Sequence, residues 1–265
     1  LRVQGIGVGA WSSSASLGTG RYTSGSFGNQ TAGVVVGGSA SGTKLSNVEH
    51  YNGTGFSSAT AFPAAIISGS GAGTQTAGLI AGGNSPSRTN AAFEYNGSSW
   101  TAANNLPGAM DNLANCGTET QSNVIMAVGR TPASGNSGTN QSVTYDGTNF
   151  ASGPNHVTTR MFNTVSGAGT GTAGLIIGGF IDPSPNAMTN CEEYDGSSWT
   201  TTGSLNVATG FATAFGTQTN AVTQVNSPNY EGSEQYNGST WAALPNIGIT
   251  SPGGLYGSSA GATGD

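Results

Sequence analysis

The sequence predicts an all-β fold of short antiparallel strands joined by tight turns, and three observations lead to this prediction. Glycine accounts for 45 of the 265 residues, whereas only 7% of the residues are charged. Short apolar runs such as Val34-Val35-Val36 recur along the chain, with 4 Trp, 8 Tyr and 9 Phe spaced between them. No segment shows the 3.6-residue periodicity of an amphipathic helix. The composition alone is also typical of a disordered chain, but the recurring apolar and aromatic residues favour a packed β-structure.

A hairpin motif of an aromatic residue, Asx, Gly, a small polar residue, any residue and a second aromatic occurs five times. Asn-Gly and Asp-Gly are strong hairpin signals because a type I′ turn needs positive φ at both central residues and these residue types tolerate it, whether the loop has two residues or four. The paired aromatics are Tyr51 and Phe56, Tyr95 and Trp100, Tyr145 and Phe150, Tyr194 and Trp199, and Tyr236 and Trp241. Successive tyrosines are 44, 50, 49 and 42 residues apart. Strand alternation predicts that the two aromatics of each motif pack together in the core.

A second motif, Thr-Ala-Gly followed by three apolar residues and Gly-Gly, occupies residues 31–38, 76–83 and 172–179. A continuous apolar run predicts a strand covered on both faces, and the final glycines indicate crowded backbones. Residues 123–129 keep the apolar run, and Arg130 is interpreted as replacing the second glycine. Residues 221–225 lack Gly-Gly and are predicted to pack less regularly.

Each repeat is predicted to hold four strands, since a strand of small residues precedes each apolar strand, as at residues 66–71. Repeated four-stranded units favour a β-propeller over a sandwich or a barrel. Trp11 lies six residues before Leu17, as Trp100 does before Leu106, and is interpreted as a sixth fourth-strand aromatic. Six blades are predicted, the last joining residues 1–11 to a strand near residues 254–258. Residues 1–265 form one predicted domain, the ordered part of a longer chain.

These motifs resemble two groups of known repeats. Gly-Gly after an apolar strand, followed by a Tyr and then a Trp about six residues later, resembles the kelch repeat. Residues 94–101 and 193–200, with residues 74–78, are similar to the glycine-rich, kelch-like repeats of marine bacteriophage structural proteins. The resemblance covers nearly the whole chain and implies a virion tail or fibre protein. It is specific for architecture only, because kelch propellers serve as enzymes, adaptors and virion parts alike.

The titratable residues form no recognisable catalytic or metal-binding arrangement. His50 and His156 have no partner at metal-ligand spacing and are predicted to lie at the surface. Glu192 and Glu193 are adjacent in a strand, point to opposite faces and cannot act together. We therefore assign no catalytic, metal or cofactor-binding residue, expect no cofactor, and predict that the protein is not an enzyme.

The cysteines, the arginines and the overall charge also give no indication of a catalytic or ligand-binding site. Cys116 and Cys191 occupy different repeat positions and are predicted to be buried free thiols. The five arginines lie in different repeats and are not expected to converge, although Arg21 and Arg160 occupy similar positions. With 6 basic and 12 acidic residues scattered singly, no basic stripe suits nucleic acid. No run approaches the roughly twenty apolar residues of a membrane-spanning helix, so no membrane insertion is expected.

The connections that differ most between repeats join the apolar strand to the tyrosine strand. They span residues 39–46, 84–90, 131–140, 180–190 and 226–233. Because they share a repeat position, they are predicted to emerge on one face of the disc, where propellers often bind partners. The alternative is that they are tolerated surface insertions. The candidate binding residues are Lys44, Asn84, Arg88, Asn136, Asn140, Phe180, Ile181, Asp182, Asn186 and Tyr230.

Three classes of function fit the sequence. The first is a virion protein in a multimeric assembly, which contacts other virion subunits or a host-surface glycan or protein. The second is a secreted or cellular kelch adaptor that grips a protein partner. The third is a carbohydrate-active propeller enzyme, which ranks last because no catalytic arrangement is found.

Overall fold

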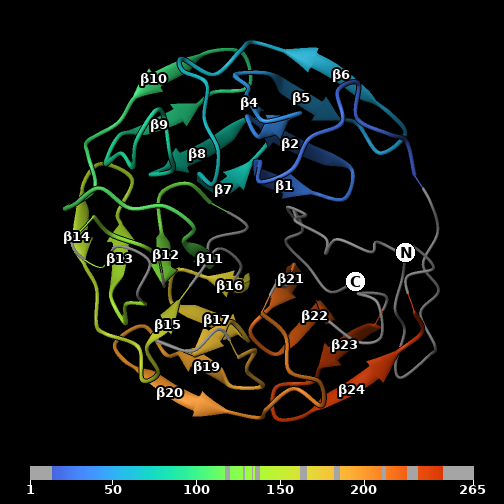
Figure 1. Cartoon of the computed structure of the whole chain (residues 1–265), viewed down its shortest axis with the longest axis vertical. Coiled ribbons are helices and arrows are strands. Elements are labelled where there is room, and N and C mark those ends of the chain that lie inside the picture. The colour runs from blue at the N-terminus through green and yellow to red at the C-terminus, as the bar shows by residue number, and fades with distance from the viewer. Residues whose placement is uncertain are drawn as a thin grey trace.

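Five four-stranded antiparallel sheets make up the part of the chain that the computed structural model describes (Figure 1). The described residues are 14–116, 120–127, 129–132, 134, 138–161, 166–181, 186–210, 213–225 and 232–246. The sheets stand around a common axis, each with its first strand innermost and its fourth strand at the rim. The fold is therefore a β-propeller, whose blades we name A to E in chain order. None of the described residues forms a helix that could cross a membrane.

All five blades share one strand order. Blade A contains β1 (Gly25–Asn29), β2 (Ala32–Val36), β5 (Val48–Tyr51) and β6 (Phe56–Ala59). Blade B contains β7 (Ser70–Thr74), β8 (Ala77–Ala81), β9 (Ala92–Tyr95) and β10 (Trp100–Ala102). Blade C contains β11 (Ala114–Cys116), β12 (Val124–Ala127), β13 (Ser142–Tyr145) and β14 (Phe150–Ser152). Blade D contains β16 (Ser166–Thr170), β17 (Ala173–Ile177), β19 (Cys191–Tyr194) and β20 (Trp199–Thr202), and blade E contains β21 (Ala214–Thr217), β22 (Asn220–Val225), β23 (Gly232–Tyr236) and β24 (Trp241–Leu244).

Two short ladders lie outside the blades. β3 (Ser39–Ala40) pairs with β4 (Thr43–Lys44), and β15 (Arg160–Met161) pairs with β18 (Phe180–Ile181). The described residues form five four-stranded sheets, whereas six blades were predicted from the sequence. Residues 1–11, including Trp11, and residues 254–258, which were predicted to form the sixth blade, lie outside the described residues.

The strand register places equivalent connections at the same end of every blade. In blade A, Val36 pairs with Gly25 and Val48 at one end, and Tyr51 pairs with Gly33 and Phe56 at the other. We call the first end, with the β2–β5 type of loop and the connectors between blades, the loop face. The second end, with the Asx-Gly turns, is the turn face. The predicted variable connections that the structure describes therefore do share one face.

Paired glycines fix the seam between blades at the loop face. Gly37 and Gly38 have φ values of 62° and 97°, which disfavour side chains, and a Cβ atom on Gly37 would collide with Ile66 of the next connector. The Gly38 N–H donates to the carbonyl of Ile66 at 2.8 Å. The N–H groups of Gly83 and Gly179 donate in the same way to Met110 and Thr209. The crowding predicted for these glycines is confirmed.

The five Asx-Gly motifs are hairpin turns, as predicted, with four residues in each loop. In the first, Tyr51 pairs with Phe56, and the Asn52 Oδ1 accepts the N–H groups of Thr54 and Gly55 at 3.0 and 2.9 Å. Only Gly53 has a positive φ, so the turn is not type I′. Asp146 and Asp195 make the same bonds, which confirms that Asp serves turn geometry there.

The hairpin aromatics fill the space between blades. Tyr95, Tyr145, Tyr194 and Tyr236 are buried, and their rings lie 4.4 to 5.0 Å from the second aromatic of their own hairpin. Three of their hydroxyls reach the preceding blade, at His50, Glu94 and Glu193. Trp199 and Trp241 are also buried, whereas Tyr51, Phe56, Trp100 and Phe150 are only half-buried.

Two further expectations concern the interior. Cys116 and Cys191 are buried free thiols, as predicted. The irregularity predicted for residues 221–225 is not seen in the strand pairing, because β22 pairs with β21 over residues 220–223 and with β23 over residues 221–225, and it buries Ala221 and Thr223. The missing glycines therefore leave the strand pairing intact.

We expect Trp199→Ala to lower the free energy of unfolding by about 3 to 5 kcal/mol, because its ring is only 5% exposed and packs against Cys116 and Ile125 of blade C. Equilibrium denaturation with urea measures this loss. Trp100→Ala is the matched control and should lose less, since Trp100 is half-buried. A loss below roughly 1 kcal/mol for Trp199→Ala would contradict the burial assigned to this ring.

Candidate functional site

The floor of the loop face contains short rows of paired residues, one row at the end of each of blades A to D. Each row joins a connector residue to the residue after the apolar strand and, in three blades, to a residue later in the same loop. The rows are Tyr22–Ser39–Lys44 in blade A, Ile67–Asn84–Arg88 in B, Asp111–Arg130 in C and Met161–Phe180–Ala187 in D. The strands of the core repeat from blade to blade, but these rows share almost no residue type. Any partner-specific chemistry on this face therefore depends on the rows and the loops above them.

The position of Arg130 differs from the sequence interpretation. Arg130 pairs with Asp111 as Asn84 pairs with Ile67, so it follows the Gly-Gly position and does not replace the second glycine. The reason is a shift in the apolar run, since Val124 pairs with Tyr145 where Gly78 pairs with Tyr95. Gly129 therefore occupies the place of the second glycine, and Arg130 belongs to the row.

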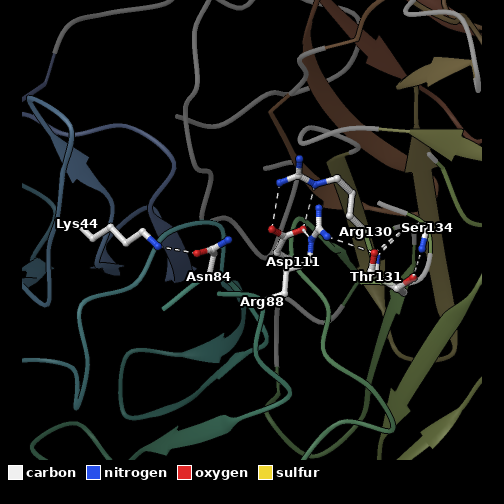
Figure 2. Close-up of polar contacts among 7 residues, drawn as sticks. All are labelled: Lys44, Asn84, Arg88, Asp111, Arg130, Thr131 and Ser134. Atoms are coloured by element: carbon white, nitrogen blue, oxygen red, sulfur yellow. Dashed lines mark hydrogen bonds and ion pairs between the residues drawn. The ribbon is translucent and has the colours of Figure 1, made fainter. Parts of the chain in front are cut away.

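A chain of polar contacts links the loops of blades A and B (Figure 2). The Lys44 Nζ donates to the Asn84 Oδ1 at 2.5 Å and to the carbonyl of Pro86 at 3.0 Å. Asn84 and Pro86 both belong to the loop of blade B. One ammonium group therefore ties two neighbouring loops together.

Two arginines then converge on one buried carboxylate, which the sequence analysis did not expect (Figure 2). The Arg88 Nε lies 3.2 Å from the Asp111 Oδ1, and Arg130 reaches both Asp111 oxygens at 3.1 and 3.0 Å. Asp111 is 1% exposed, whereas the side chains of Arg88 and Arg130 are 18% and 16% exposed. The Arg88 Nη1 also donates to the carbonyl of Thr131 at 3.3 Å. Asp111 thus fixes both guanidinium groups at the surface and braces loop B against loop C.

The start of the blade C loop closes on itself. The Thr131 N–H donates to the Ser134 Oγ at 3.0 Å, and the Ser134 N–H donates to the Thr131 Oγ1 at 3.1 Å (Figure 2). These reciprocal bonds hold the carbonyl of Thr131 beside Arg88. The loop is therefore shaped before any partner arrives.

The other two described arginines are structural. Arg21 pairs with Glu49 at 2.5 Å and Arg160 pairs with Glu192 at 2.6 Å, and both guanidinium groups are fully buried. Each arginine also donates to two backbone carbonyls of its own blade, one just after the apolar strand, at Gly37 or Gly178, and one just before the tyrosine strand, at Asn47 or Asn190. The similar repeat positions predicted for Arg21 and Arg160 are confirmed, and neither side chain can meet a partner.

Buried glutamates fix the connectors by accepting hydrogen bonds from connector N–H groups. Glu192 accepts the N–H groups of Val157 and Thr158 at 2.7 and 3.0 Å, and Glu49 accepts that of Gly18 at 2.7 Å. Glu234 does the same for Asn206 and Val207 in blade E. Glu193 points the other way and accepts the Tyr236 hydroxyl, so the prediction that Glu192 and Glu193 cannot act together is confirmed.

The surface position predicted for His156 is wrong, whereas His50 is partly exposed. His156 is 1% exposed and occupies the repeat position that Leu106 and Leu205 fill in other blades. Burial lowers the pKa of His156 to about 4, because the charged imidazolium loses its hydration; Glu192 opposes this shift and Arg160 adds to it. His50 is half-buried, and its Nε2 lies 3.0 Å from the Tyr95 hydroxyl. Among the residues that the structure describes, no group of three or more His, Cys, Asp and Glu could hold a metal ion.

The structure brings together three of the predicted binding residues, Lys44, Asn84 and Arg88. Asn140 has a structural role, since its carbonyl accepts the His156 N–H at 2.9 Å. Asn136, Asp182 and Tyr230 lie outside the described residues.

The remaining candidates lie on blade D. Phe180 is half-buried against Gly210, where an added Cβ atom would collide with its ring. Ile181 is 44% exposed, and Asn186 is exposed beside it, with its carbonyl accepting the Ile181 N–H at 3.0 Å. Ile181 and Asn186 are therefore available to a partner, and Phe180 mainly supports the loop.

Sequence reasoning missed four residues of this face. Asp111 and Arg130 form the ionic centre, and Tyr22 and Val157 are large apolar residues that are 45% and 58% exposed. Asp111, Tyr22 and Val157 belong to connectors, whereas the variable positions considered in the sequence were those of the loops. The sequence did contain a signal for the connector residues. Each connector has one buried position before the first strand, and the residue directly after that position differs from blade to blade: Tyr22, Ile67, Asp111, Met161 and Gly210.

No protein-family model matches the chain, and no curated protein matches it. The role of this face therefore has to be inferred from the geometry of its rows.

We expect His156→Leu to remove part of the acid sensitivity of the fold. Since the folded pKa of His156 is depressed below the ordinary 6.5, the unfolded chain takes up a proton first, and stability falls as the pH drops from 6.5 towards 4. Between pH 7.5 and pH 5 the parent should lose about 2 kcal/mol more than His156→Leu does, measured by urea unfolding at both values. His50→Gln, the control, should retain most of the dependence. Equal losses in the parent and His156→Leu would refute this assignment.

Proposed function

We propose that this propeller is a non-catalytic binding module of a virion, a tail or fibre component that contacts neighbouring subunits or a host-surface glycan through its loop face. The observation that supports this proposal best is the contrast between the two faces. The turn face repeats the same Asx-Gly turn in all five blades. The described rows of the loop face, in blades A to D, differ from one blade to the next. When a scaffold repeats everywhere except on one face, the residues that determine partner binding are expected on that face.

The large exposed apolar side chains are also concentrated on the loop face. Among the described residues, the large exposed apolar side chains are Tyr22, Val157 and Ile181, and all three belong to connectors or loops of the loop face. Isolated exposed apolar residues are common, but their restriction to one end of the blades is not expected of a passive surface.

The state of the carboxylates supports a non-catalytic role. Glu49, Glu192 and Glu234 are buried and accept connector N–H groups, and Asp111 is buried between two arginines. Asp146 and Asp195 are committed to turns. General acid-base catalysis requires a carboxylate with access to substrate, and these groups are used to hold the fold.

A virion setting is favoured by the resemblance of the repeats to kelch-like repeats of phage structural proteins. Many copies on one particle would raise weak single-site binding through multivalency. A cellular kelch adaptor would use the same face, and recovery of a specific protein partner in place of particle attachment would point to that role.

The experiment targets blade D with point substitutions, because replacing residues 180–190 would remove structural bonds. The Met188 N–H donates to Gly179 and the carbonyl of Thr189 accepts the Leu205 N–H, at 2.9 Å each. We expect Ile181→Ser with Val157→Ser to fold normally and to weaken particle assembly or host-cell attachment about tenfold, the effect of losing roughly 1.4 kcal/mol of contact energy.

Ser99→Ala, at an exposed position on the turn face, is the matched control and should behave like the parent. Thermal unfolding confirms that each variant is folded. If particles with the double substitution assemble and attach as well as the parent does, the loop face of blade D is not the functional surface.

A further inference from the structure

The accessible positive charge of the described chain is confined to one part of the loop face. Arg21 and Arg160 are buried in ion pairs. Lys44, Arg88 and Arg130 are the other described cations, and they lie in successive rows of blades A, B and C (Figure 2). The whole chain has a formal net charge of -6. A local excess of cations on an acidic protein marks where an anion would be attracted.

Two cations of this cluster share one described carboxylate, Asp111, which is buried and faces both guanidinium groups. The third cation, Lys44, is held by the amide oxygen of Asn84 and the carbonyl of Pro86. Exposed carboxylates are found on the turn face, at Asp146 and Asp195, and thus at the far end of the blades. Among the residues that the structure describes, the exposed carboxylates therefore lie on the turn face and the partly exposed cations on the loop face.

The cluster is held in place before a ligand binds. Asp111 orients Arg88 and Arg130, Thr131 accepts from Arg88, and Lys44 is held by Asn84 and Pro86. Groups that are already ordered lose little side-chain entropy on binding. Guanidinium groups match the geometry of carboxylate and sulfate, with which they form paired hydrogen bonds.

The same rows supply the other groups that a saccharide uses. Tyr22 stands at the start of the row that ends with Lys44, and it is 45% exposed. Residues directly opposite in paired strands place their side chains on one side of the sheet. An aromatic ring offers an apolar surface to the C–H groups of a sugar, and the amide of Asn84 offers hydrogen bonds to its hydroxyls.

We propose that the rows of blades A, B and C bind an acidic glycan, with Arg88, Arg130 and Lys44 facing its carboxylate or sulfate groups and Tyr22 against a sugar ring. This assignment rests on the proposed role of the loop face and names the chemistry of its ligand. Three cations are too few for the continuous phosphate tracking that nucleic acid requires. Blade D, with Phe180 and Ile181, is a separate apolar region of the same face.

The test measures binding of the whole chain to polygalacturonate, dextran sulfate and neutral dextran by calorimetry at low and high salt. The first two probes distinguish carboxylate from sulfate. The parent should bind at least one acidic polymer, more weakly at high salt, and should not bind neutral dextran. Lys44→Gln with Arg88→Gln should weaken binding by at least about tenfold, through loss of charge-assisted hydrogen bonds.

The matched control is Asn96→Asp with Asn237→Asp on the turn face. It changes the net charge by the same two units, at turn positions where Asp146 and Asp195 show that Asp is accepted. The control should bind like the parent, apart from a small general effect of charge. If Arg88→Gln lowers the melting temperature, Lys44→Gln with Tyr22→Ala replaces it, since this pair leaves both arginine contacts of Asp111 in place.

Two results would overturn the inference. One is a parent that binds neither acidic polymer, and the other is equal weakening by the loop-face and turn-face pairs. Neither decides the proposed function, which Ile181→Ser with Val157→Ser tests on blade D. A protein that attaches through blade D but ignores acidic polymers would keep its proposed function and lose this ligand.

Discussion

The contact on which the rest of the propeller depends is the one between the glycine end of each apolar strand and the connector to the next blade. Gly38, Gly83 and Gly179 donate to connector carbonyls at 2.8 Å, and the preceding Gly37 leaves no room for a Cβ atom. Because the connector is fixed there, the first strand of the next blade begins at a set height and angle. The seam therefore sets the position of each next blade in the same way. The residues beside the seam can vary in type.

Because the residues beside the seam can vary, the same scaffold holds both buried ion pairs and ion pairs that remain partly exposed. At the connector position directly over the seam, Arg21 and Arg160 are buried with Glu49 and Glu192. Buried ion pairs add little net stability, because desolvation offsets their attraction, so we regard these as positioning devices for the connectors. One residue further along, Asp111 receives two arginines that remain partly exposed. A shift of one position therefore separates structural charge from charge that a ligand can meet.

The repeat also tolerates local departures that weaken the fold. His156 fills a leucine position beside an ion pair, and burial lowers its pKa to about 4. β22 lacks the glycine pair and still pairs with β21 over residues 220–223 and with β23 over residues 221–225, since the strand ladder depends on backbone bonds. The ladder within a blade is therefore less sensitive to sequence than the seam between blades.

The propeller, the four strands per blade, the Asx-Gly hairpins and the common face of the variable loops could be predicted from the sequence, because they result from local turn chemistry and a repeated spacing. Lys44, Asn84 and Arg88 were found in the same way, since they differ between repeats. The contact of Arg88 and Arg130, 42 positions apart in the chain, with one shared Asp111 is visible only in the folded protein. The same holds for the burial of His156 and for the partial exposure of Trp100. Such contacts join different blades, and the angle and height at which blades meet are set by packing that no local pattern encodes.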